Sequence, residues 1–286
     1  MKTTGIFRTA VYRIPIRKFG DPITIIPFGD VHFGSPLCAA TEFRRHVDYG
    51  ADNPNAYYIG MGDYQDLASA TDRAYLTKVL RESSRESLED LYKTLCDDFA
   101  KEISFMTGRI IGLVEGNHYA EFMDGSTSTM RLCDKLKTTY LGVMTIVRIQ
   151  FFDVKRPNVF VSMDLCAHHG KSAARLLGSS LNTVQQLAEG VEADIYLMGH
   201  DHKRGCVPGS TIRLVANRKA HSVEVRERRQ LFCRTGSFLK GMVDGHASYI
   251  ADMALRPVDL GGIRLEITPY CNTRTTPMSL EMRAVV

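Results

Sequence analysis

Short apolar runs that each end in glycine and a polar residue recur along the first half of the chain. The runs are Ile23 to Phe28, Ala56 to Ile59 and Arg109 to Val114. They lead into Gly29-Asp30, Gly62-Asp63 and Gly116-Asn117-His118. Runs of this length predict buried strands, and the residues after them predict turns. Because functional groups gather at the carboxyl ends of strands in open α/β sheets, we expect the residues after these strands to form a site.

A helical pattern lies between the second and third of these strands. Leu88, Leu91, Tyr92, Leu95, Phe99 and Ile103 recur at helical spacing. They predict a helix from about Ser84 to Phe105, whose apolar face belongs to the core. Ser83 and Glu86 fit a capping box at its start. The segment before it, from Asp66 to Arg85, resembles a loop with a short helix, and we expect it to form a wall over the site.

Strands predominate in the second half of the chain. A short helix is predicted at Asn182 to Glu189, and strands at Thr145 to Phe152, Val159 to Met163, Ile195 to Met198, Ile212 to Ala216, His221 to Val225, Leu231 to Arg234, Ser248 to Met253 and Ile263 to Thr268. Several alternate in polarity between turn residues, as antiparallel strands do. No repeat or linker interrupts the pattern, so we expect one domain over residues 1–286, with a helical insertion at about 66–107.

Composition narrows the class of protein. The chain is 44% hydrophobic and 24% charged, with a formal net charge of +4, which fits a globular protein and excludes wholesale disorder. Its seven cysteines are widely spaced and form no Cys-x-x-Cys, which argues against a disulfide framework or a zinc knuckle. The sequence has neither a signal-peptide core nor an apolar stretch of about 18 residues. We therefore expect a cytoplasmic protein with reduced thiols and no membrane partner.

Five short motifs rich in metal-type ligands follow one another in order. They are Asp30-Val31-His32, Gly62-Asp63, Gly116-Asn117-His118, His168-His169-Gly170 and Gly199-His200-Asp201-His202. Carboxylate, amide oxygen and imidazole nitrogen together suit Mn, Fe, Zn or Ni, and the absence of cysteine argues against a structural zinc site. A set of this size is too large for one such ion. It fits two ions that lie about 3.5–4 Å apart and share one carboxylate.

These motifs resemble those of the calcineurin-like metallophosphoesterase superfamily, over about Phe28 to Phe238 and including Gly236-Ser237. The resemblance implies an α/β fold, an α/β/β/α sandwich of two mixed β-sheets flanked by helices, with a dimetal site at the carboxyl ends of strands. It implies a first metal held by Asp30, His32, Asp63 and His202, and a second held by Asp63, Asn117, His169 and His200. The cofactors are then two divalent ions, with Mn favoured over Fe, Zn and Ni.

The same resemblance implies a mechanism. A hydroxide bridging the two ions would attack phosphorus in line, with no covalent enzyme intermediate. His118 would be catalytic without binding metal, because it would protonate the leaving oxygen or stabilise its charge.

The chain departs from the superfamily's pattern at places that bear on its substrate. Gly62-Asp63 continues as Tyr64-Gln65-Asp66, without the Asp-Arg-Gly of Ser/Thr phosphoprotein phosphatases. Asp66 stands where purple acid phosphatases have a metal-binding tyrosine. Both families are therefore disfavoured. Only the second histidine of His168-His169 fits the motif, since it precedes Gly170, and His168 is interpreted as a core or supporting residue.

Residues outside the ligand set indicate the substrate less clearly. Candidate substrate contacts are Arg73, Tyr119, Lys171, Lys203 and Arg204, with an ordinary surface role as the alternative for the basic residues. His246 can approach the site or lie on the surface, and the basic run 217–229 can follow a polyanion or form a charged hairpin. We expect a phosphodiesterase or nuclease whose partner is a nucleotide or nucleic acid. The alternatives are a phosphomonoesterase acting on a metabolite or phosphoprotein, and a non-catalytic scaffold.

Overall fold

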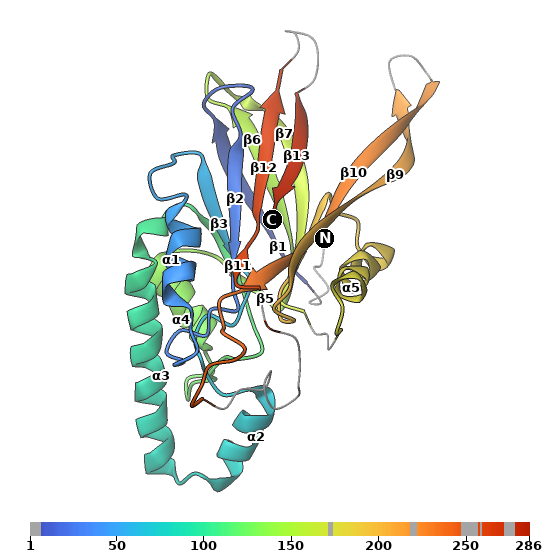
Figure 1. The fold of residues 1–286 in the computed structure, drawn as a ribbon. Helices are drawn as coiled ribbons and strands as arrows, with labels where there is room; N and C mark the ends of the chain where they lie inside the picture. The colour runs from blue at the N-terminus through green and yellow to red at the C-terminus, as the bar shows by residue number, and fades with distance from the viewer. Residues whose placement is uncertain (1–6, 171–173, 218–221, 247–256, 258, 272–277) are drawn as a thin grey trace.

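The computed structural model describes residues 7–170, 174–217, 222–246, 257, 259–271 and 278–286, and their strands form two sheets (Figure 1). The first sheet runs in the order β1 (Arg8–Ile16), β6 (Met144–Asp153), β7 (Arg156–His168), β8 (Ile195–Met198), β10 (Ser222–Ser237) and β11 (Gly261–Gly262), with β9 (Arg204–Asn217) paired to β10. The second runs β13 (Ser279–Val285), β12 (Arg264–Tyr270), β2 (Ile23–Phe28), β3 (Ala56–Gly60), β4 (Ile110–Val114) and β5 (Tyr140–Gly142). Each sheet is mixed, because each contains both parallel and antiparallel pairs.

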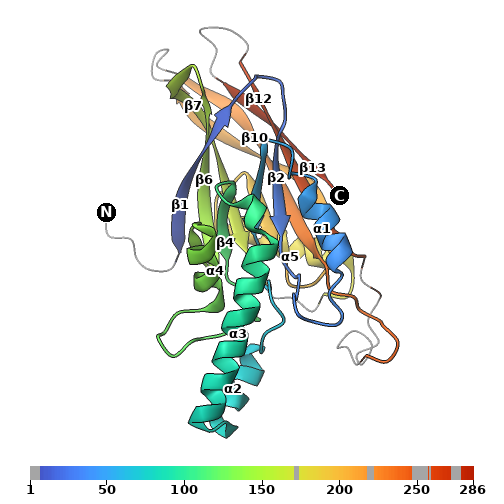
Figure 2. The ribbon, with the colours of Figure 1, turned by 90° about the vertical axis from the view of Figure 1, so that its left-hand side faces the viewer.

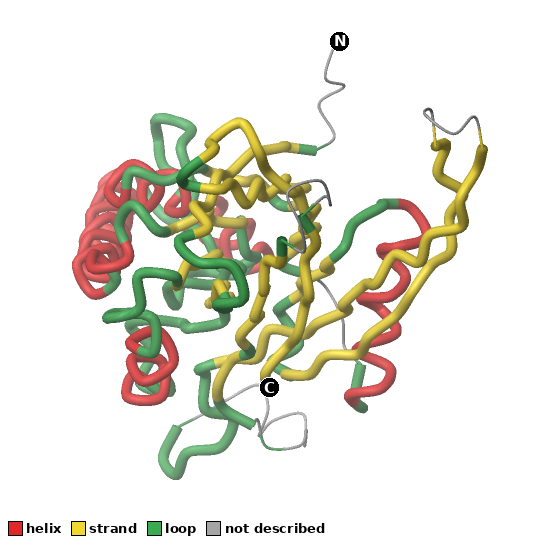
Figure 3. Tube along the Cα trace, turned by 90° about the horizontal axis from the view of Figure 1, so that it is seen from above, coloured by secondary structure: helices red, strands yellow, loops and turns green. Residues whose placement is uncertain are grey.

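Helices cover the outer face of each sheet, so the layers are helix, sheet, sheet and helix (Figure 3). The second sheet carries α1 (Ala40–Asp48), α3 (Glu82–Glu102), the 3-10 turn η1 (Ser104–Met106) and α4 (Ser128–Leu136), and the first carries α5 (Leu177–Gly190). Phe43, Phe99 and Leu132 of these helices join Phe28 of β2 in one apolar cluster. A separate cluster fills the space between the sheets. The expected fold class, two mixed sheets flanked by helices, is confirmed.

The strand predictions in the first half agree closely with the structure. β2, β3 and β4 each begin and end within one residue of the predicted apolar run. All three are buried along their whole length. A strand covered on both faces is apolar throughout, which is why a continuous run identified it.

The predicted capping box of the long helix is wrong. α3 begins at Glu82, and its N-cap Arg81 makes no side-chain cap, so Ser83 and Glu86 already lie inside the helix. The capping box belongs instead to α2 (Ala70–Val79), where Ser69 is paired with the residue three positions later. Only a short extended connection separates the end of α2 from α3. The start of α3 therefore lies earlier in the chain than the predicted start at Ser84.

The three short strands predicted over residues 212–234 are wrong in number, because they are parts of β9 and β10 alone. β10 pairs antiparallel with the whole of β9, from Arg204 opposite Thr235 to Asn217 opposite Ser222. Arg226, Glu227 and Arg229 of β10 are exposed charged residues inside the strand, so charged positions do not mark turns here. The strand predicted at Ser248 to Met253 lies outside the described residues.

The helices α2 and α3 lie between β3 and β4, in the segment where the sequence indicates an insertion. α2 and the N-terminal half of α3 extend past the ends of the strands (Figure 2). None of the helices in the described part of the chain is long and apolar enough to cross a membrane.

Candidate metal centre

The loops that follow several parallel strands meet at one edge of the two sheets. Asp30 N, after β2, donates to Gly62 O at 3.0 Å, after β3. Gly199 N, after β8, donates to His169 O at 2.8 Å, after β7. The residue after β10 joins them, since Phe238 N donates to Asp30 O at 2.9 Å. Backbone bonds therefore fix these loops against one another before any side chain is considered.

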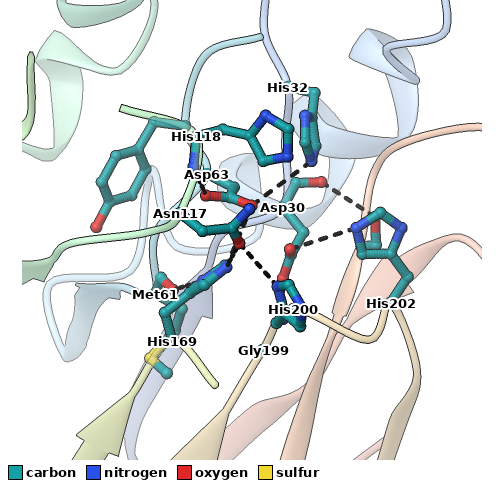
Figure 4. A network of polar contacts seen from close by, with 12 residues as sticks. Asp30, His32, Met61, Asp63, Asn117, His118, His169, Gly199, His200 and His202 are labelled. Atoms are coloured by element: carbon teal, nitrogen blue, oxygen red, sulfur yellow. Dashed lines mark hydrogen bonds and ion pairs between the residues drawn. The ribbon is translucent and has the colours of Figure 1, made fainter. Parts of the chain in front are cut away.

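The structure brings the predicted ligands together in two groups (Figure 4). The groups are Asp30, His32 and His202, and Asp63, His169 and His200, and within each group the ligand atoms lie within 4.8 Å of one another. Asn117 belongs with the second group, because its Oδ1 lies 2.9 Å from His169 Nε2 and 2.8 Å from His200 Nδ1. These are the two sets that the resemblance implies.

Asp63 lies between the two groups. Its Oδ2 is 3.1 Å from His169 Nε2 in one group and 3.9 Å from His32 Nε2 in the other. Its Oδ1 accepts a hydrogen bond from His118 N at 2.9 Å. Gly116 permits this approach, since a Cβ there would lie 2.0 Å from Asp63 Oδ1. One carboxylate therefore faces both sets of ligands.

The backbone is strained at the residues that carry these ligands. Positive φ occurs at the non-glycine residues Asp30, His32, Asp63, His200 and His202, with values from 48° to 73°. In the described part of the chain, Lys137 is the one other non-glycine residue with positive φ. Such conformations cost about 1–3 kcal/mol each and collect at functional sites, where the surroundings hold them. The strain is therefore concentrated on the candidate ligands.

Buried polar atoms at the centre fit a bound cation. Asp30 Oδ1 and His32 Nε2 are buried and make no hydrogen bond. Their contacts with His202 Nε2 at 3.4 Å and with Asp63 Oδ2 at 3.9 Å are ion-pair contacts only. A buried polar group without a partner costs about 1–3 kcal/mol. A cation placed among carboxylate oxygens and imidazole nitrogens would satisfy these atoms, so the donor set fits a divalent metal ion.

The electrostatics of the centre favour positive charge among the carboxylates. Burial opposes ionisation of Asp63, but the nearby His169 and His32 hold the pKa of its carboxyl well below the ordinary value. Burial also opposes the charge on His169, but Asp63 raises the pKa of that imidazole to about 9. The pKa of His200 is lowered, first by burial and then by His169. The Asp63 carboxylate therefore stabilises positive charge at this place, which is either a proton on His169 or a bound cation.

Two acceptors orient the imidazoles of His169 and His32 from behind. His169 Nδ1 donates to Met61 O at 2.7 Å, which leaves Nε2 directed at the centre. His32 Nδ1 contacts Asp66 Oδ1 at 3.2 Å. Partners of this kind fix the tautomer and orientation of a ligating histidine. Neither Met61 nor Asp66 was predicted from the sequence to belong to the site. The only signal was an acidic residue three positions after Asp63, and a backbone carbonyl leaves no signal.

His118 lies beside the ligands at the partly exposed rim of the centre. Its Nδ1 donates to Leu67 O at 2.8 Å, which leaves Nε2 for other partners. Its ring centroid is 4.9 Å from that of His32. His32, Asp66 and His118 form a third group whose ligand atoms lie within 4.8 Å of one another, which the sequence did not predict.

The predicted substrate contacts have other partners in the structure. Arg73 Nη1 donates to the carbonyl oxygens of Ala68, Asn117 and Tyr119 at 2.7, 3.0 and 2.7 Å. The Arg73 guanidinium also stacks on the Tyr119 ring, 3.8 Å from its centroid. These contacts support the turn that carries Asn117, and a substrate contact by Arg73 or Tyr119 stays a prediction.

The basic residues after the last ligand are paired with acidic ones. Lys203 Nζ lies 3.7 Å from Asp201 Oδ2, and Arg204 Nε lies 2.7 Å from Asp259 Oδ2. Lys171 lies outside the described residues, so its predicted role is untested.

The remaining histidines differ from the ligands in their position. His169, the residue favoured by the sequence, joins the centre, whereas His168 ends β7 opposite Met144. His246 is exposed, in a turn where it pairs with Val243.

Comparisons with known proteins add little to this geometry. The chain matches no protein-family model and no curated protein. Among solved structures it is similar to vacuolar protein sorting 29 from Cryptosporidium parvum, with 14% sequence identity over 94% of this chain and 99% of that chain. The TM-score of this match is 0.34. A TM-score this low carries no information about ligands or activity.

Proposed function

We propose that this protein is a phosphoester hydrolase that uses two divalent cations. The observation that carries the proposal is the convergence of two ligand groups on Asp63. Mixed oxygen and nitrogen ligands favour Mn, with Fe, Zn and Ni as alternatives. When bound, such a pair of ions supplies a nucleophile at neutral pH and offsets the charge on phosphoryl oxygens.

The residues of the chain have separate tasks in this proposal. Asp30, His32 and His202 hold one ion, Asn117, His169 and His200 hold the other, and Asp63 serves both. Met61 O and Asp66 keep the imidazoles of His169 and His32 in position. His118 Nδ1 donates to Leu67 O, which leaves Nε2 for the substrate, and with a second proton on Nε2 the imidazolium would donate that proton to the leaving oxygen.

The finer proposal is a phosphodiesterase that acts on nucleotides or nucleic acid in the cytoplasm. Lys203 and Arg204 follow the last ligand directly and support a polyanionic substrate, whose phosphates would replace the carboxylates of Asp201 and Asp259 as their partners. The rival is a phosphomonoesterase. With Mn²⁺ present, hydrolysis of bis-p-nitrophenyl phosphate should exceed that of p-nitrophenyl phosphate. A clear preference for the monoester would exclude the finer proposal and keep the hydrolase.

A non-catalytic scaffold is the alternative from another class. The strained backbone at five candidate ligands and the buried atoms without hydrogen bonds speak against it, because a scaffold gains nothing from either. A panel of phosphomonoesters, phosphodiesters, single-stranded DNA and RNA separates the two. A Mn²⁺-loaded protein that hydrolyses none of them would be a scaffold.

A further inference from the structure

Asp201 lies between two candidate ligands in the sequence, but its side chain points away from the candidate metal centre. It lies between His200 and His202, and its side chain is only 2% exposed. Its carboxylate accepts a hydrogen bond from Ser180 Oγ on α5 and contacts Lys203 Nζ at 3.7 Å. Asp201 belongs to none of the ligand groups found among the described residues. The residue between the two histidines is therefore fixed to the body of the protein.

Arg234 of β10 holds the same loop from within the protein. Its side chain is fully buried, with 0% exposure. Nη1 donates to Gly199 O at 2.8 Å, and Nε and Nη2 donate to Ser180 O at 3.1 and 3.0 Å. Nε also lies 3.6 Å from Asp201 Oδ2. One guanidinium thus connects the end of β8, the loop after it and α5.

The loop held in this way carries strained ligands. His200 and His202 have φ of 73° and 59°. Conformations of this kind persist only when surrounding contacts impose them. The buried pair of Asp201 and Arg234 supplies such contacts, because separating the two would leave the fully buried guanidinium of Arg234 without a carboxylate. His200 N adds a bond to Asp30 Oδ2 at 3.0 Å from the opposite side.

We propose that Arg234 and Asp201, with Ser180, are positioning residues that set the geometry of His200 and His202 for the metal ions. This role rests on the proposed function, because it deepens the account of the same centre. The charged pair acts through the loop and touches neither ion nor substrate. A small side chain at position 201 would keep both histidines but release the loop that presents them.

The test compares the wild-type chain with Asp201→Asn, Arg234→Lys and Ser180→Ala. Asn preserves the shape of Asp201 without its charge, and Lys cannot reproduce the donor fork of Arg234. Removing a partner behind a metal ligand typically lowers metal affinity about 10- to 100-fold. We expect Asp201→Asn and Arg234→Lys to weaken Mn²⁺ binding at least tenfold in calorimetric titrations, and Ser180→Ala to weaken it less.

Arg109→Lys is the matched control. Arg109 also clamps backbone carbonyls, those of Gly50, Asn53 and Ala51, but at the opposite end of β4 from the centre. We expect Arg109→Lys to lower the melting temperature of the metal-free protein without changing Mn²⁺ affinity. If Arg234→Lys does not fold, Asp201→Asn and Ser180→Ala decide.

Two results would overturn the role. One is an Asp201→Asn protein whose Mn²⁺ affinity stays within twofold of wild type while its melting temperature falls, which would make the pair merely structural. The other is a folded wild-type chain that binds no Mn²⁺, which would remove the proposed function and this role together. Loss of affinity in the variants alone, with two ions bound by wild type, supports the role whatever the substrate proves to be.

Discussion

Histidine side chains are buried in two regions of the molecule, and the two regions differ in whether the buried ring nitrogens have hydrogen-bond partners. Where α1 packs on β2, His46 Nε2 donates to Pro27 O at 3.0 Å, so the buried ring has a partner. At the candidate centre, His32 Nε2 and Asp30 Oδ1 are buried without any hydrogen bond. A satisfied polar group is ordinary core, whereas unsatisfied polar atoms on a strained loop are typical of a functional site. The difference separates a structural histidine from a functional one.

The charges around the two regions follow the same division. Burial lowers the pKa of His46 to about 4, because its neighbours offer no negative charge to offset the loss of water. His169 is similarly buried, but the Asp63 carboxylate raises its pKa to about 9. Neighbouring carboxylates, rather than burial alone, therefore distinguish the two imidazoles.

The largest effect is expected at the carboxylate that both ligand groups face. Asp63→Asn keeps the shape of the side chain but removes the charge between the two cations. We expect Mn²⁺-dependent hydrolysis to fall by about a thousandfold, and metal binding to fall with it. The control is Asp153→Asn, which removes a buried carboxylate paired with Arg156 in the β6–β7 hairpin, and it should leave both unchanged. Equal losses of hydrolysis and metal binding in the two variants would contradict the proposal that Asp63 serves both ions.

The backbone at the centre should tolerate change poorly. Gly62 has φ +96°, and a Cβ there would lie 2.6 Å from Gly116 Cα. We expect Gly62→Ala to destabilise the protein by about 3 kcal/mol or more, as measured by urea unfolding. Gly125 also has positive φ, +80°, but has open space around it. Gly125→Ala should therefore cost only about 1 kcal/mol, and a similar cost for both would mean that the close approach at Gly62 is unimportant.

His118 should separate catalysis from metal binding. His118→Gln removes the proton donor but leaves Asp63 and both ligand groups in place. We expect kcat to fall about a hundredfold while two Mn²⁺ ions still bind. Loss of one ion in this variant would instead identify His118 as a ligand in the third group, with His32 and Asp66.

The smallest effect is expected at His46 and depends on pH. Its folded-state pKa, about 4, lies below the ordinary 6.5, so the unfolded chain binds more protons between these values. The stability from neutral His46 is therefore complete above pH 6.5 and declines as the pH falls toward 4. Between pH 7 and pH 5 the loss should be about 2 kcal/mol. In His46→Gln this part of the decline should vanish. A wild-type-minus-variant difference that does not change with pH would contradict the assignment.

Sequence predicted the ligands better than it predicted what supports them. The strands β2, β3 and β4 are apolar except for Thr24, and the polar residues at their ends, such as Asp63, therefore stood out. The supports did not stand out, because Met61 acts through its carbonyl and Arg234 through contacts with distant segments. Contacts between α5 and β10 join segments that are far apart in the sequence, so no local sequence pattern indicates them. The Ser69 capping box was missed because a nearby Ser83 and Glu86 offered the same spacing.

The central claim is that Asp63 faces two cations at once, and anomalous scattering from crystals grown with Mn²⁺ tests it most directly. The account predicts two peaks about 3.5–4 Å apart, one beside Asp30, His32 and His202 and the other beside Asn117, His169 and His200, with Asp63 between them. A single peak, or peaks that leave Asp63 without a metal neighbour, would contradict it.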